Sequence, residues 1–141
     1  MKRLLLALLL GFTAGMALAG DKPQVKNAWV REAPPGASMM AAYLEIDNPG
    51  DSDITLVDVD SPTFAHVMMH RTVTVDGIAR MQHEDSIRIP AHGSVTLAPG
   101  GYHLMMPAPQ TRLVAGDKVE LVLHFDDNSR LQVTAEVRKK P

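Results

Sequence analysis

Apolar and polar residues alternate with a period of two along most of the chain, and this pattern predicts β-strands. The clearest runs are residues 118–125 and 131–138, with turn residues 126–129 between them. Shorter alternating runs recur between turn residues, as in all-β domains. Asp76-Gly77 separates two of these runs and predicts a tight hairpin. The segments that show this pattern are residues 25–31, 39–47, 54–59, 65–75, 78–83, 86–89, 94–97, 102–105, 118–125 and 131–138. We expect about eight or nine short strands in an antiparallel sandwich, each with one buried face.

The first nineteen residues have the features of a secretory signal peptide rather than of a folded domain. Lys2 and Arg3 precede an apolar run over residues 4–12, and Ala17-Leu18-Ala19 is a small-residue cleavage signal. The run is shorter than the roughly 20 apolar residues of a membrane span. We therefore expect residues 1–19 to be cleaved, residues 20–141 to form a single periplasmic domain, and no stable membrane span to remain.

Composition excludes several classes of protein. The chain has no cysteine, so it forms no disulfide, blue-copper thiolate site, iron–sulfur cluster or CxxC redox pair. Its formal net charge is −2, and the basic residues are scattered rather than gathered into a stripe, which argues against nucleic-acid binding. No serine lies in a G-x-S-x-G or S-x-x-K context, and no glycine-rich phosphate loop is present, so we do not expect an enzyme.

Methionine and histidine gather in one part of the chain, between residues 66 and 106. Strand alternation divides them, because successive side chains point to opposite faces of a sheet. Met69 and Met106 are expected to face the core, His92 to lie in a turn, and His124 to face solvent. The residues eligible as metal ligands are His66, Met68, His70, Met81, His83, His103 and Met105. The pattern does not choose among these seven.

Thioethers and imidazoles without a thiolate favour Cu(I), because soft sulfur ligands select cuprous ions. Cu(II) is expected to bind more weakly. A zinc site formed by histidines with Glu84 or Asp85 remains an alternative, although thioether is not among zinc's usual ligands. Binding requires neutral imidazole, so affinity should fall as the pH drops through about 6.5. A general copper buffer or resistance protein and a structural adhesin-like sandwich are also compatible with the pattern.

The spacing His-x10-Met-x21-His-x-Met occurs as His70, Met81, His103 and Met105. Pro99-Gly100-Gly101 stands just before the last pair, and the segment continues through Leu104. In these residues the chain resembles the PCu(A)C family of periplasmic copper chaperones, over roughly residues 29–137.

This resemblance implies a cupredoxin-like antiparallel Greek-key sandwich that binds one Cu(I) through His70, Met81, His103 and Met105. Met68, His66 and His83 are expected to be auxiliary donors. The resemblance also implies delivery of copper to a cytochrome oxidase subunit, in concert with a Sco-type thioredoxin-like protein. Some members of the family have a Met- and His-rich C-terminal tail, whereas this sequence ends in Arg138-Lys139-Lys140-Pro141. We therefore expect one principal site, and a monomer.

Overall fold

The computed structural model describes residues 22–140, and this part of the chain consists of strands and turns without a helix. The predicted all-β fold is confirmed. The strands are β1 (Gln24–Arg31), β2 (Met39–Asn48), β3 (Ile54–Asp60), β4 (Met68–Val75), β5 (Ile78–His83), β6 (Ile87–Ile89), β7 (Gly93–Leu97), β8 (Tyr102–Pro107), β9 (Lys118–Phe125) and β10 (Arg130–Arg138). Each of the ten alternating segments forms a strand, whereas eight or nine strands were expected, because even the short β6 and β7 pair with a longer strand. The predicted signal peptide lies outside the described residues.

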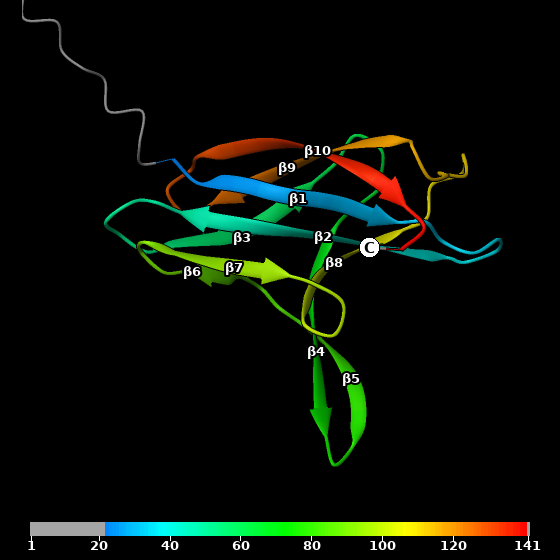
Figure 1. The fold of residues 1–141 in the computed structure, drawn as a ribbon, viewed down its shortest axis with the longest axis horizontal. Coiled ribbons are helices and arrows are strands. Elements are labelled where there is room, and N and C mark those ends of the chain that lie inside the picture. The colour runs from blue at the N-terminus through cyan, green and yellow to red at the C-terminus, as the bar shows by residue number, and fades with distance from the viewer. Residues whose placement is uncertain (1–21, 141) are drawn as a thin grey trace, which may run out of the picture.

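The strands hydrogen-bond in the order β5-β4-β8-β2-β1-β10-β9-β3-β6, and β7 also pairs with β2. The pairing of β1 with β10 is parallel, and the others are antiparallel. One edge of β2 is shared: β8 pairs with residues 39–42, and β7 pairs with residues 44–48. The sheet therefore continues from β2 through β8 to β4 and then β5, and these last two strands project from the rest of the sheet (Figure 1).

The core forms from the apolar face of each alternating strand. In β9, Val119, Leu121, Leu123 and Phe125 are all buried, as the pattern predicts. In β8, Leu104 and Met106 are fully buried, and Met69 of β4 packs in the same core. These positions confirm that Met69 and Met106 serve packing. Burial of one face fixes the strand registers, because a slip of one residue would turn every buried side chain to the opposite face.

Strands β4 and β5 form a hairpin that projects from the body of the domain (Figure 1). Its two-residue turn is Asp76-Gly77, with φ angles of 51° and 76°. Positive φ at both positions is the requirement of a type I′ turn, whose twist matches that of the flanking strands. The hairpin predicted from the sequence is thus confirmed.

Two strand boundaries differ from expectation by more than one residue. Strand β4 begins at Met68 rather than at residue 65, because the preceding loop is anchored elsewhere. Phe64 is buried in the core, and the Ser61 hydroxyl donates a 2.6 Å hydrogen bond to the Glu120 carbonyl of β9. Strand β8 continues two residues beyond its expected end at residue 105, to Pro107, which lies opposite Met39. A proline is tolerated there because the end of a strand can forgo a ladder hydrogen bond.

Candidate metal centre

Three histidines form a row across three neighbouring strands. His70 of β4 lies directly opposite His83 of β5 on one side and His103 of β8 on the other. The ring centroids of His70 and His83 are 5.6 Å apart, and those of His70 and His103 are 5.9 Å apart. Because directly opposite residues point to the same face of a sheet, all three imidazoles lie on one face. We call these residues the histidine row.

Two thioethers lie on the same face, next to the histidine row. Met68 of β4 is directly opposite Met105 of β8, and each stands two residues from a histidine on its own strand. Both methionines are half-buried. We call Met68 and Met105 the methionine pair.

His103 has the environment of a metal ligand. It is only 4% exposed, and its Nδ1 lies 3.0 Å from the carbonyl oxygen of Gly101. A carbonyl can only accept, so Nδ1–H is the donor and the lone pair of the neutral ring is on Nε2. Nε2 is buried and has no hydrogen-bond partner among residues 22–140. A buried nitrogen lone pair left free in this way fits coordination to a metal ion.

The Gly101 carbonyl was not among the functional groups expected from the sequence. It also accepts a 3.1 Å hydrogen bond from the backbone N–H of Thr72, so it ties β4 to the start of β8 while it orients His103. The preceding turn is closed by a 3.0 Å hydrogen bond from Gly101 N–H to the Ala98 carbonyl, with Gly100 at a φ of 86°. The Pro-Gly-Gly sequence was the available signal for this support.

His70 supplies a second free imidazole nitrogen. Its Nδ1 is buried, and no partner for it lies in the described part of the chain. Burial lowers the pKa of His70 below its ordinary value, and the neighbouring His103 and His83 lower it further. The ring therefore stays neutral, with a lone pair available, to a lower pH than an exposed histidine.

Met81 lies outside the compact group. It is opposite Thr72 of β4, one step nearer the hairpin turn than the histidine row, and it is 63% exposed. The register nevertheless places Met81 on the ligand-bearing face, because His83 two residues later is on that face. His66 precedes β4 in an exposed loop, so alternation along a strand does not assign it to this face. Six of the seven candidates thus share one face.

The acidic residues near His83 serve other contacts. The Glu84 carboxylate oxygen Oε1 lies 2.9 Å from Nε of Arg71, without hydrogen-bond alignment, and Arg71 covers the ring of Tyr102 at 5.4 Å. Asp85 lies 3.3 Å from Nε2 of His83, but its side chain is almost fully exposed. No three histidine or acidic side chains within residues 22–140 are arranged to hold a metal, so the zinc alternative has no preformed ligand set there.

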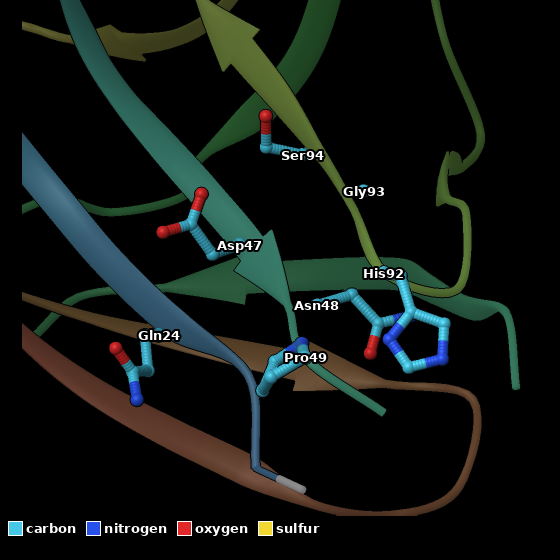
Figure 2. Close-up of a pocket in the computed structure, with 7 residues that line it drawn as sticks. All are labelled: Gln24, Asp47, Asn48, Pro49, His92, Gly93 and Ser94. Carbon is cyan, nitrogen blue, oxygen red and sulfur yellow. The ribbon is translucent and has the colours of Figure 1, made fainter. Parts of the chain in front are cut away.

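The two histidines set aside in the sequence lie elsewhere, as expected. His92 is in a turn with a φ of 53°, and its Nε2 is 2.7 Å from Asp51. His124 on β9 is 2.6 Å from Asp60. His92 lines an open hollow of about 410 Å³ together with Asp47 and Asn48. Figure 2 shows how these side chains lie. Asp47 and Asn48 belong to the end of β2 that pairs with β7, and His92 immediately precedes β7, whereas β8 pairs with the other end of β2.

Comparison with known proteins assigns this chain to a family. A sequence model of the LpqE-like family, described as "Putative lipoprotein LpqE-like", matches residues 24–137. The chain belongs to the LpqE-like family. A protein named as a putative lipoprotein in Leifsonia xyli subsp. xyli is 37% identical to this LpqE-like chain over 119 residues, which cover 84% of this chain and 70% of the relative.

Solved structures similar to this LpqE-like chain include copper-bound domains. The copper-bound PCuAC domain from PmoF2 superposes with a TM-score of 0.70 at 26% identity, covering 87% of this chain and 97% of that domain. The Cu(I) form of DR1885 from Deinococcus radiodurans superposes with a TM-score of 0.66 at 31% identity, covering 90% of this chain and 83% of that chain. The resemblance to the PCu(A)C family and the cupredoxin-like fold are thereby confirmed.

The described part of this LpqE-like chain contains no helix long and apolar enough to cross a membrane. The fold of this chain is that of copper-binding domains.

Proposed function

We propose that this protein is a Cu(I) metallochaperone whose ligands are His70, Met81, His103 and Met105. The observation that carries the proposal is a pair of buried imidazole nitrogens, Nδ1 of His70 and Nε2 of His103, that have no hydrogen-bond partner within residues 22–140. Both lie on the face that also holds the thioethers. Leaving such polar atoms unpaired costs about 1–3 kcal/mol each. A bound metal ion would satisfy both.

The chemistry of the four donors supports Cu(I) as the cargo. Thioether and imidazole are neutral, and soft sulfur favours the cuprous ion, whereas Cu(II) prefers nitrogen and oxygen donors and should bind more weakly. A Cu(I) held by neutral ligands keeps its positive charge. Transfer to a thiolate site on an acceptor then gains charge neutralisation, which gives the exchange a direction. No electron is transferred, so the role requires no catalytic turnover.

The cellular setting belongs to the same proposal. Residues 1–19 direct export and are cleaved, and residues 20–141 act in the periplasm as a monomer. The acceptors are a cytochrome oxidase subunit and a Sco-type thioredoxin-like protein. Export is supported by the lipoprotein name of the family and of the similar Leifsonia xyli protein.

Neighbouring methionines on β8 offer a matched test of the ligand set. Met105→Leu should weaken Cu(I) binding by on the order of tenfold or more, since it removes a soft donor and keeps the apolar volume. Met106→Leu should leave the affinity unchanged, because Met106 is buried in the core. Anaerobic titration against a cuprous chelator measures both. Equal affinities for the two variants would contradict the proposed site.

Delivery is separated from buffering by a transfer experiment. The Cu(I)-loaded protein is mixed with an equimolar reduced Sco-type protein, and the copper on each is measured after separation. We expect copper to move to the acceptor within the mixing time of the experiment, because the thiolates neutralise its charge. Retention of copper by this protein under those conditions would favour the buffer or resistance role instead.

A further inference from the structure

The positions of the thioethers raise a question about the fourth ligand. His70 and His103 are an opposite pair on β4 and β8, and Met105 belongs to the next pair on the same face. Met81 lies on β5, on the other side of β4 from β8. The fourth member of these two pairs is Met68, which lies directly opposite Met105 and two residues from His70. Met68 is not one of the four motif residues.

Sheet geometry shows how compact this group is. Opposite β-carbons are about 5 Å apart, and same-face neighbours along a strand are about 6.8 Å apart. Met68, His70, His103 and Met105 therefore mark a rectangle whose centre is about 4 Å from each β-carbon in a flat sheet. A thioether sulfur two bonds from its β-carbon can approach an ion above that centre. In the same flat sheet the β-carbon of Met81 is about 13 Å from this centre, so its sulfur reaches the ion only if the hairpin curls.

The surroundings of the two thioethers differ as well. Met68 is half-buried beside the body of the domain, where β4 pairs with β8. Met81 is 63% exposed on β5, which among the described strands lies at the edge of the sheet and pairs with β4 alone. One thioether is thus held in a packed position, and the other is open to an approaching protein.

We propose that Met68 is a fifth copper ligand that exchanges with Met81, so that Cu(I) is held by His70, His103, Met105 and either thioether. One copper–sulfur bond forms as the other breaks, and the oxidation state of copper does not change. When Met68 holds the ion, Met81 is free and the exposed side of the copper can accept a ligand from the acceptor. This inference rests on the proposed function, since it assigns a further ligand to the same Cu(I) site.

A double-mutant cycle on the full chain tests the exchange. Met68→Leu and Met81→Leu should each lower Cu(I) affinity by less than about tenfold, because the other sulfur replaces the one removed. The double variant should lose more than the product of the two single effects, by at least about tenfold. Leucine conserves the volume of methionine, so the fold should be retained, and thermal unfolding verifies this. Met69→Leu, one residue along β4 and buried in the core, is the matched control.

X-ray absorption at the copper edge supplies a second readout. Copper bound to the Met81→Leu variant should show two sulfur scatterers, from Met68 and Met105, and the double variant should show one. If Met68→Leu changes neither affinity nor sulfur count in the Met81→Leu background, Met68 is no ligand and this inference is overturned. If the unmodified protein fails to bind one Cu(I), the proposed function fails first. The two failures are therefore distinguishable.

Discussion

His103→Ala should lower the affinity for Cu(I) by at least about 100-fold. Removing a residue that only supports a metal ligand costs about 10–100-fold in affinity, and removing a ligand itself should cost at least as much. The loss of affinity should exceed that of any single methionine variant, because His103 is buried and its ring orientation is fixed. Its Nδ1–H donates to the Gly101 carbonyl, and its buried Nε2, the proposed donor to copper, has no hydrogen-bond partner among the residues that the structure describes. Anaerobic competition with a cuprous chelator measures the change.

His124→Ala is the control for this experiment. His124 lies on β9 beside Asp60, away from the strands that carry the proposed ligands. Its removal should leave Cu(I) affinity unchanged. If both histidine variants bind copper as the unmodified protein does, His103 is not a ligand, and its buried nitrogen would need another explanation.

Leu104→Ala should produce the largest loss of stability. Leu104 stands between His103 and Met105 on β8, but its side chain points to the core and is fully buried. Removing a buried leucine side chain to its β-carbon typically lowers the free energy of unfolding by about 2–5 kcal/mol, through lost burial and the cavity left behind. Urea denaturation of the copper-free protein measures the loss.

The matched variant is Leu104→Met, which keeps the volume and should cost less than about 1.5 kcal/mol. Because β8 presents the proposed ligands on one face and core residues on the other, the methionine variant should bind copper normally. An alanine variant as stable as the methionine variant would show that this part of the core tolerates the cavity, contrary to the packing described.

Alternation along single strands predicted which side chains share a face. It separated Met105 from Met106, and Met68 from Met69, and the structure bears out both separations. It also predicted the Asp76-Gly77 hairpin, because the turn chemistry is local. These features depend on residues close together in the sequence, where the period of a strand determines side-chain direction.

The pairing of β4 with β8 could not be predicted in this way. It depends on contacts between residues far apart in the chain, so the sequence offered seven candidate ligands but no row or rectangle. His66 was placed on the ligand face because the strand was expected to begin at residue 65. Burial of Phe64 holds that loop away from the ladder instead. A local pattern contains no information about such an anchor.

The hairpin of β4 and β5 is joined to the domain chiefly through β8, and this arrangement links metal occupancy to local order. The proposed ligands come from both parts: His103 and Met105 from the body, and His70 and Met81 from the hairpin. An ion that bridges the two parts stabilises the closed hairpin by mass action. Conversely, a partial opening of the hairpin would weaken the ion's hold while the core remains folded. Copper could then depart at the energetic cost of a local fluctuation rather than of global unfolding.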